Sequence, residues 1–270
     1  MVSFDRNPMG TVVDDVADAI LLARAEGRCL EAPYGGSPLD AEQAYAVQHR
    51  VVAARLARGE RIVGWKLGYT SAVMREQMGI VEPNFGPLTD AMLLADGASV
   101  PTAARQPKVE PEIALVLGRD VPNSMDAVGI RSCVARAHAA LEIVDSVWCD
   151  YRFGWADNTA DGSSAAYVVL GPQVSFDGDD DLASLPVSLE RNGDSCGSGR
   201  GADAMGDPLV ALAWLSDRLI ERGEQLRAGD VVITGGLTRA VPLEPGDVVV
   251  ALIGAVAVTA HGAAGTVVEC

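Results

Sequence analysis

The segment VEPEIALVLG, residues 109–118, places two glutamates at the head of an otherwise apolar run. If the segment is a β-strand, its side chains alternate between two faces, and Glu110 and Glu112 share one of them. Residues 114–117 are apolar on both faces, which favours a strand that is covered on both sides. The segment therefore predicts a central strand of a buried sheet, with two acidic side chains that point the same way.

The acidic pair admits two interpretations. At a rise of about 3.3 Å per residue, the two backbones stand roughly 6.6 Å apart, a spacing from which both carboxylates can reach one cation. Such a pair also occurs on solvated strand faces, because acidic side chains are mostly exposed. If the pair is buried, its like charges repel and need either protonation or a bound ion. Spacing alone leaves both interpretations open.

Composition narrows the class of protein. The chain has 270 residues, of which 49% are hydrophobic, enough for one large domain or for a small segment joined to a bigger one. No run of about 18 uncharged apolar residues occurs, and the start, MVSFDRNPMG, lacks the basic-then-apolar pattern of a signal peptide. We therefore expect a soluble, cytoplasmic protein with no membrane partner.

Charge restricts the partners and the kind of site. The net charge of −16 repels nucleic acid, which we exclude as a partner. The same field opposes an anionic metabolite, so a pocket for a carboxylate needs local positive charge from a metal or a lysine. The five scattered cysteines form no CxxC pair and the three histidines stand alone, so neither a zinc cluster nor a disulfide framework is indicated.

The pattern along the chain predicts an α+β protein. Residues 12–26 and 40–58 have helical periodicity, and Asp40 with Gln43 forms a capping-box pattern. From Ile62 onward, short β-like runs dominate, interrupted by expected helices at residues 124–141 and 208–222. Because the strands come in runs, we expect a mixed, rolled β-sheet core with packed helices. Residues 1–60 then form a helical N-terminal segment, and residues 61–270 form the β domain.

Three further stretches contain polar residues in apolar surroundings. IVGWKLGYTS (residues 62–71) carries Lys66 in a strand-like run, where a lysine is usually a surface residue. ALEIVDS (residues 140–146) carries Glu142, which the pattern places where a helix joins a strand. WADNTADGSSAAYVVLG (residues 155–171) is a polar loop that leads into a buried strand, a common position for binding residues. Each stretch alone also fits an ordinary structural role.

Taken in order, the motifs resemble the hydratase/decarboxylase branch of the fumarylacetoacetate hydrolase superfamily. That branch contains the 2-keto-4-pentenoate hydratases and 4-oxalocrotonate decarboxylases of catechol meta-cleavage. The resemblance spans nearly the whole chain, and its ordered set is specific although each motif is modest. It rests on GWKLGYTS, EPNFGPLTDAM, VEPEIALVLG, ALEIVDS, ADGSS, LRAGDVVITGGLT and LEPGD.

The resemblance implies a metal-dependent site. The metal ligands of the family fall on Glu110, Glu112 and Glu142, which would hold Mg²⁺ or Mn²⁺ through oxygen atoms. In the family, the ion binds the C1 carboxylate and C2 ketone oxygen of a 2-oxo acid. The active-site lysine matches Lys66, which would stabilise the enolate oxygen or hold the carboxylate. The resemblance also implies a small anionic 2-oxo acid substrate and a homo-oligomer, with possible association with a related hydratase.

The reaction is less closely specified than the site. Hydratases carry EPDYG or EPDFG, whose aspartate serves proton transfer, whereas this chain has EPNFG with Asn84. The GGLT motif also resembles the decarboxylase form. We therefore predict decarboxylation of a 2-oxo-3-enedioate, similar to 4-oxalocrotonate, through a metal-stabilised dienolate. The alternatives are a 2-keto-4-pentenoate-type hydratase and a non-catalytic partner subunit of such a complex. A C–C hydrolase would need a histidine as base, and none of the three histidines lies in a suitable motif.

The resemblance assigns further roles and has departures. Asn84 is predicted to act in catalysis, and Thr70, Ser163 and Ser164 to bind the substrate. The family's ADN reads ADG here, so an amide is missing at Gly162. The arginine that commonly follows DS is a valine at position 147. Both departures predict that the distal end of the substrate is bound differently. A biosynthetic relative that acts on a different 2-oxo acid is therefore an alternative.

Overall fold

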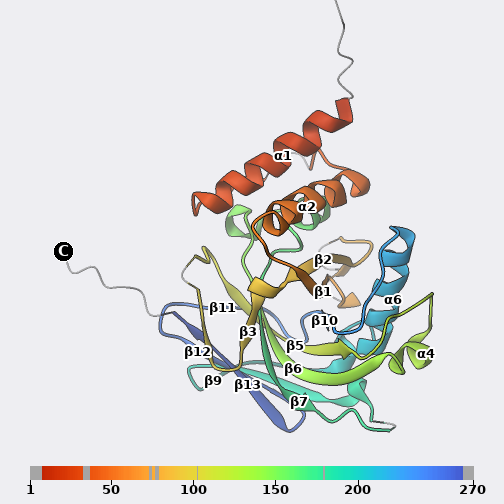
Figure 1. Cartoon of the computed structure of the whole chain (residues 1–270). Coiled ribbons are helices and arrows are strands. Elements are labelled where there is room, and N and C mark those ends of the chain that lie inside the picture. The colour runs from red at the N-terminus through yellow and green to blue at the C-terminus, as the bar shows by residue number, and fades with distance from the viewer. Residues whose placement is uncertain are drawn as a thin grey trace, which may run out of the picture.

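Two β-sheets form the centre of the molecule, and helices lie around the larger one (Figure 1). The computed structural model describes residues 8–32, 37–72, 75–76, 79–101, 103–178 and 180–263. Within these residues the larger sheet contains, in spatial order, β2 (Asn84–Thr89), β1 (Ile62–Gly68), β10 (Val231–Ile233), β5 (Lys108–Leu117), β6 (Val134–Val144), β7 (Ala165–Val174) and β3 (Leu93–Ala95), and β11 (Val241–Pro242) pairs with β5. The smaller sheet contains β4 (Ala98–Val100), β13 (Val256–Gly262), β12 (Val248–Ile253), β8 (Pro186–Arg191) and β9 (Asp194–Arg200).

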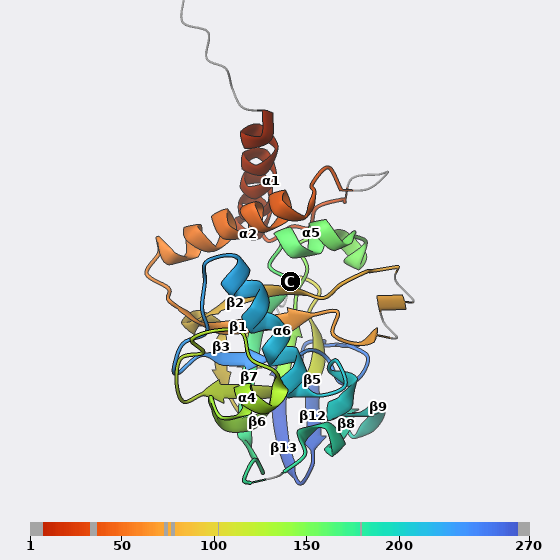
Figure 2. The same cartoon turned by 90° about the vertical axis from the view of Figure 1, so that its right-hand side faces the viewer.

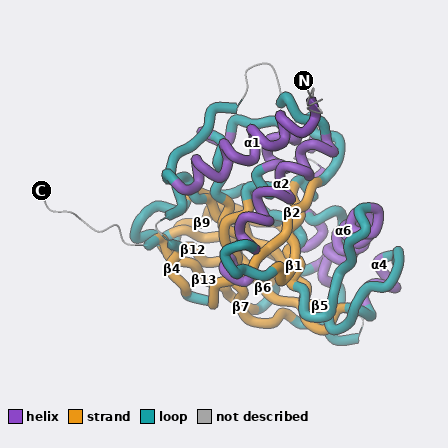
Figure 3. Tube along the Cα trace, turned by 45° about the horizontal axis from the view of Figure 1, so that its top comes forward, coloured by secondary structure: helices purple, strands orange, loops and turns teal. Residues whose placement is uncertain are grey.

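The larger sheet is mixed. β1 pairs with β10 in parallel and β3 pairs with β7 in parallel, whereas β5, β6 and β7 form an antiparallel series. The sheet curls, and the smaller sheet packs against its inner strands, as the block of strands below the helices shows (Figure 3). The predicted α+β class with a mixed, rolled sheet is thereby confirmed.

The segment VEPEIALVLG occupies the middle of the larger sheet. β5 lies between β10 and β6, and its side chains are buried from Pro111 to the end of the strand. Ile113 and Leu115 contribute to the main hydrophobic core, and Ala114 contributes to a second cluster on the other side of the sheet. Coverage on both faces explains why the run is apolar at consecutive positions rather than at alternate ones.

The C-terminal helix follows the sequence signals at both ends. α6 (Pro208–Glu221) begins after Asp207, whose carboxylate accepts a hydrogen bond from the amide of Leu209. Pro208 lies at the first helical position, where its missing amide hydrogen costs nothing. The helix ends at Glu221, and Gly223 after the cap adopts a left-handed φ of 75°. The predicted helix over residues 208–222 is confirmed.

Three helices gather at one end of the molecule (Figure 2). They are α1 (Pro8–Ala25), α2 (Ala41–Leu56) and α5 (Trp155–Ala160), and they share a small hydrophobic cluster that includes Ile20, Val47 and Trp148. The capping box of Asp40 and Gln43 is present at the start of α2. Gln48 of α2 donates hydrogen bonds to the backbone oxygens of Phe85 and Thr159. These bonds connect the N-terminal helices to the β part, and the division at residue 60 stays a prediction.

The expected helix over residues 124–141 is wrong. Only α4 (Ala127–Arg131) is helical there, and β6 begins at Val134. The alanine-rich sequence VARAHAAL favours a helix by local propensity, but hydrogen bonding to β5 and β7 on both sides overrides that preference. Glu142 consequently lies inside a strand rather than at a junction of helix and strand. Among the described helices, none is long and apolar enough to cross a membrane.

Candidate active site

Three glutamates meet at the centre of the larger sheet. Glu110 and Glu112 lie on the same face of β5, and the register of β6 places Glu142 directly opposite Glu110. One carboxylate oxygen from each residue lies within 4.8 Å of the others. Glu112 and Glu142 are 0% and 1% exposed, so this is not a solvated strand face. The spacing of the strand and the pairing of two strands therefore bring the three predicted ligands together.

A buried lysine lies beside the glutamates. Lys66 of β1 is 3% exposed, and its Nζ stands 2.9 Å from Oε1 of Glu142. The same ammonium donates a hydrogen bond of 2.7 Å to the backbone oxygen of Ser163. Burial opposes the charge, but Glu142 and the other two glutamates outweigh it and raise the pKa of Lys66. Lys66 is therefore held as a cation at neutral pH.

The glutamates are held in an electrostatically unfavourable arrangement. Burial, and then repulsion from Glu142, raises the pKa of Glu110 to about 7. The same two causes raise the pKa of Glu112 well above that of an ordinary glutamate. One ammonium faces three carboxylates, so the cluster has an excess of negative charge when it is ionised. Such an excess is reduced either by protonation or by a cation.

The oxygen atoms of the cluster fit a divalent ion. Oε2 of Glu112 accepts a hydrogen bond of 2.6 Å from the amide of Gly235. Oε1 of Glu112 and Oε2 of Glu142 have no hydrogen-bond partner although both are buried. Buried carboxylate oxygens are rarely left without a partner, and hard oxygen ligands suit Mg²⁺, Mn²⁺ or Ca²⁺. Gly236 leaves the necessary room, because a Cβ at this position would come within 2.8 Å of Oε2 of Glu110.

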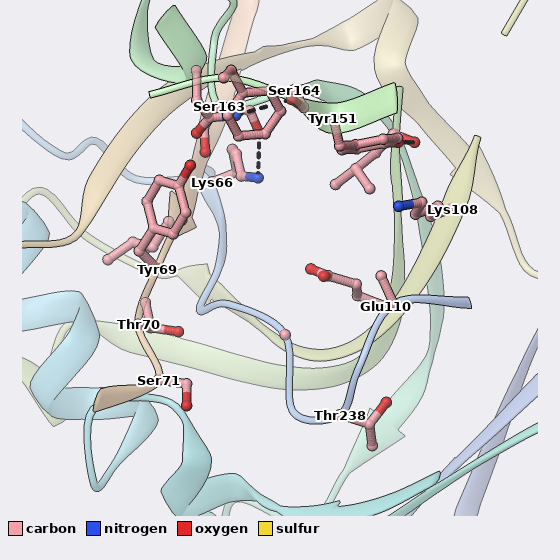
Figure 4. A pocket seen from close by; sticks show the side chains of 17 residues that line it. Lys66, Tyr69, Thr70, Ser71, Lys108, Glu110, Tyr151, Ser163, Ser164 and Thr238 are labelled. Atoms are coloured by element: carbon pink, nitrogen blue, oxygen red, sulfur yellow. Dashed lines mark hydrogen bonds between the residues drawn. The ribbon is translucent and has the colours of Figure 1, made fainter. Parts of the chain in front are cut away.

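The cluster adjoins a pocket of about 270 Å³ (Figure 4). Lys66 and Glu110 form part of its lining, together with the predicted residues Thr70, Ser163 and Ser164. Glu112 and Glu142 lie deeper, behind this lining. The structure thus brings the predicted metal ligands, lysine and substrate-binding residues to one place, while their roles stay predictions. The remaining lining residues that the argument uses are Tyr69, Lys108, Tyr151 and Asn158.

A network of neutral side chains backs one wall of the pocket. The amide nitrogen of Asn84 donates to Oδ1 of Asn158 and to the hydroxyl oxygen of Thr159. The Ser163 hydroxyl donates to Oδ1 of Asn84, and Asn158 donates to the hydroxyl oxygen of Ser164. Asn84 is fully buried and is not part of the lining. It positions Ser163 and Asn158, which do line the pocket, instead of facing a substrate itself.

Asn158 places a side-chain amide at the pocket, whereas Gly162 is not part of the lining. It lies on α5, one helical turn before Gly162, and its side chain is buried at the pocket wall. Gly162 instead adopts a left-handed φ of 73° in the turn before the two serines. The sequence motifs did not identify Asn158, because its place at the pocket depends on the position of α5 in the fold. The valine at position 147 is buried among the N-terminal helices and does not face the pocket.

Tyr69 is a second pocket residue that the sequence motifs did not identify. It has a left-handed φ of 57°, which is unusual for a bulky side chain. Arg75 stabilises this turn by donating hydrogen bonds to the backbone oxygens of Tyr69 and Thr70. The Tyr69 hydroxyl is buried without a partner, and burial raises its pKa, so it stays protonated. The turn therefore presents an unused hydrogen-bond donor to the pocket.

Comparison with known proteins agrees with this geometry. Residues 62–268 match the model of the fumarylacetoacetate (FAA) hydrolase C-terminal family. The chain belongs to this family. Its relatives in the hydratase/decarboxylase branch confirm the predicted resemblance, and they are enzymes.

The relatives carry names for both reactions. A 2-keto-4-pentenoate hydratase of Burkholderia vietnamiensis (strain G4 / LMG 22486) is 43% identical over 200 residues, 73% of this chain and 76% of the hydratase. A 4-oxalocrotonate decarboxylase of Pseudomonas sp. (strain CF600) is 35% identical over 206 residues, 76% of this chain and 78% of the decarboxylase. Sequence similarity to members of the FAA hydrolase family therefore does not decide between hydration and decarboxylation.

A solved structure covers almost the whole chain. It is 4-oxalocrotonate decarboxylase from Pseudomonas putida G7 in complex with magnesium and adipate, with a TM-score of 0.87 and 30% identity. The match spans 96% of this chain and 100% of that protein. The same decarboxylase has also been solved with calcium and acetate. Together with the acidic cluster of this chain, these complexes make a divalent ion at the three glutamates consistent with the family.

Proposed function

We propose that the protein is a lyase that decarboxylates a 2-oxo-3-enedioate in a divalent-metal-dependent reaction. The observation that carries the choice of reaction is the state of Asn84. Its amide is neutral, fully buried and hydrogen-bonded at both ends. It has no proton to exchange at the position where hydratases of the family have an aspartate, whereas decarboxylation needs no base there to begin.

The reaction can be written with the charges balanced. The bond between C5 and the remote C6 carboxylate breaks, and C6 leaves as CO₂. The bonding pair forms a C4–C5 double bond, the C3–C4 double bond shifts to C2–C3, and negative charge collects on the C2 oxygen. Uptake of one proton by that oxygen gives a 2-hydroxy-2,4-dienoate. The barrier therefore falls when positive charge and hydrogen-bond donors face the C2 oxygen.

Residues of this chain supply those interactions in the proposal. The ammonium of Lys66, held by Glu142 and the Ser163 backbone, faces the developing negative charge. The Tyr69 hydroxyl, protonated and without a partner, donates a hydrogen bond to a substrate oxygen. The hydroxyl groups of Ser163 and Ser164 are fixed by the network around Asn84, and Thr70 lines another part of the pocket, beyond Tyr69 (Figure 4). Burial of Lys66 limits water near the reacting atoms.

Glu110, Glu112 and Glu142 hold the divalent ion in this proposal, and Mg²⁺ or Mn²⁺ fits their oxygen atoms. The chemistry that such an ion supplies is Lewis-acid polarisation of the 2-oxo acid. The three carboxylates keep the ion beside Lys66, and the ion offsets the repulsion that raises the pKa of Glu110 and Glu112.

Hydration of a 2-hydroxy-2,4-dienoate is the second candidate. It is favoured by the 43% identity to a relative named 2-keto-4-pentenoate hydratase. Both reactions pass through related conjugated enolates, so one site can suit either. Retention of the glutamates and Lys66 in one cluster argues against a non-catalytic partner subunit, because unpaired buried carboxylates cost stability and serve no packing purpose. We also propose a cytoplasmic homo-oligomer with a small anionic substrate.

One experiment separates these possibilities. The purified protein is incubated with Mg²⁺ and either 2-oxohex-3-enedioate or 2-hydroxypenta-2,4-dienoate, while CO₂ release and dienoate absorbance are followed. We expect CO₂ release that stops when the metal is chelated. Loss of dienoate absorbance without CO₂ release would establish hydration instead. If neither CO₂ release nor loss of absorbance is seen and the protein does not bind Mg²⁺, only the non-catalytic role is left.

A further inference from the structure

The chain contains only two lysines among its 21 basic residues, and both line the same pocket. The first, Lys66, uses two of its three N–H donors on Glu142 and on the Ser163 backbone. The second, Lys108, lies at the start of β5 on the face that also carries Glu110. A chain that otherwise uses arginine for positive charge thus places its only two compact ammonium groups in one cavity.

Lys108 forms no direct ion pair with a described carboxylate. Within the described part of the chain, no carboxylate lies within ion-pair distance of its ammonium. Its Nζ stands 3.8 Å from the centre of the Tyr151 ring. Figure 4 shows this ammonium directed toward the pocket interior, beside that ring. Glu110 attracts this ammonium from a longer distance, but a cation that faces a cavity and touches no carboxylate keeps its N–H donors free for an anionic ligand.

The aromatic ring holds the lysine in place. The Tyr151 hydroxyl lies 2.9 Å from the backbone oxygens of both Gln106 and Val144, so the ring cannot swing away without losing a hydrogen bond. A cation above an aromatic face is stabilised by the ring electrons but keeps its N–H donors available. Lys108 is therefore oriented before a ligand arrives, and it pays little of the entropy that a free surface lysine would lose.

Position along the strand indicates which end of a ligand Lys108 meets. Glu112 and Glu142 form the buried end of the site, while Glu110 and Lys108 are only half-buried. Lys108 precedes Glu110 by two residues, about 6.6 Å along the strand. A ligand whose 2-oxo acid head lies at the glutamates thus has its far end within reach of Lys108.

We propose that Lys108, positioned by Tyr151, binds the distal carboxylate of the substrate and makes the site selective for 2-oxo dicarboxylates over 2-oxo monocarboxylates. This inference rests on the proposed function, because it assumes that the 2-oxo acid head lies at the glutamates. It adds a specificity residue, which recognises the second carboxylate of the proposed substrate.

The test compares two ligands of equal chain length. Binding of 2-oxoadipate and of 2-oxohexanoate is measured by calorimetry in the presence of Mg²⁺. We expect wild-type protein to bind 2-oxoadipate about 10- to 100-fold more tightly, the usual value of a charge-assisted hydrogen bond. Lys108→Met keeps the unbranched apolar stem of the side chain but removes its ammonium group, and it should bring the two dissociation constants together while 2-oxohexanoate binding stays unchanged.

Further variants separate a local contact from a general charge effect. Lys108→Arg keeps the charge and should keep the preference. Tyr151→Leu removes the ring and should reduce the preference in part. Arg136→Met removes one positive charge from an exposed side chain of β6 outside the pocket, and it should leave both dissociation constants unchanged. Thermal unfolding and a Mg²⁺ titration of each variant confirm that the fold and the metal site are intact.

The outcomes distinguish this inference from the proposed function. If wild-type protein binds both ligands equally, or if Lys108→Met weakens both by the same factor, Lys108 does not read the distal carboxylate and the inference is wrong, although the 2-oxo acid site stands. A parallel loss of Mg²⁺ affinity in that variant would instead assign Lys108 to the charge balance of Glu110. If neither ligand binds wild-type protein with Mg²⁺ present, the proposed function fails and the inference fails with it.

Discussion

The two sides of the pocket differ in how well their polar groups are satisfied. On the glutamate side, three carboxylates face one ammonium, and Oε1 of Glu112 has no hydrogen-bond partner. On the amide side, Asn84, Asn158 and Ser163 use their side-chain groups in a closed network of hydrogen bonds. Both sides are buried to a similar degree, so exposure to water does not explain the difference.

In the protein alone, the glutamate side is the one whose polar groups remain unsatisfied. Buried neutral groups with full hydrogen bonding need nothing further and serve to fix geometry. Buried like charges with unpartnered oxygens are stable only if something from outside compensates them. The glutamate side therefore fits a cation, whereas the amide side fixes the geometry of the pocket wall. Substitutions on the two sides should consequently have opposite effects on stability and activity.

The largest effect is expected from Glu112→Gln. The change removes one of three metal ligands, and activity should fall by roughly a hundredfold or more, because a metal ion contributes several kcal/mol to such reactions. The metal-free protein should be as stable as wild type or more stable, since one buried like charge is gone and the amide oxygen still accepts the bond from Gly235. Turnover and thermal unfolding with and without Mg²⁺ check both parts. Wild-type activity in this variant would contradict the ligand assignment.

The opposite pattern is expected from Asn158→Ala. The change removes one of the two acceptors of the Asn84 amide nitrogen and the donor to the Ser164 hydroxyl oxygen in a buried region, at a cost of about 1–3 kcal/mol for each donor or acceptor that stays unsatisfied. Denaturant unfolding should show this loss, whereas the Mg²⁺ affinity should be nearly unchanged. A loss of Mg²⁺ affinity equal to that of Glu112→Gln would mean that the two sides do not work separately.

The pH dependence of metal stabilisation sharpens the contrast. In the metal-free protein the pKa of Glu110 is raised to about 7 and that of Glu112 is also raised, so the folded state binds more protons than the unfolded state. Their contribution to stability is therefore present at low pH and lost as pH rises through the folded pKa. Because the ion binds ionised carboxylates, the increase in Tm on adding Mg²⁺ should be larger at pH 8 than at pH 6, by about 2–4 °C for each kcal/mol. An equal increase at both values would show that the glutamates do not titrate in this range.

The smallest effect is expected from Asn84→Asp. The new carboxylate gives the Ser163 hydroxyl a charged acceptor, through which a proton can move at the pocket wall. It also turns a donor toward Asn158 into an acceptor, so some stability is lost. We expect a several-fold rise in hydration of 2-hydroxypenta-2,4-dienoate, measured by loss of dienoate absorbance. Unchanged hydration would show that position 84 does not control the reaction.

Much of the fold followed from local sequence signals. The capping box at Asp40, the Asp207–Pro208 start of α6 and the apolar run of β5 are short-range patterns whose physical causes act within a few residues. The helix predicted over residues 124–141 was wrong because long-range contacts, not local signals, decide the structure there. Alanine-rich β6 is a strand because it lies between β5 and β7, and that requirement comes from residues far away in the chain.

The sequence by itself determined that Glu110 and Glu112 share a face, because alternation along a strand is a property of the backbone. Tertiary structure decided that Glu142 meets them, that Asn84 lies behind the pocket wall, and that Asn158, Tyr69 and Lys108 face the cavity. These placements depend on strand register, on one turn of α5 and on a left-handed turn after β1. No local pattern encodes such distances, since each arises only when segments separated by tens of residues pack together.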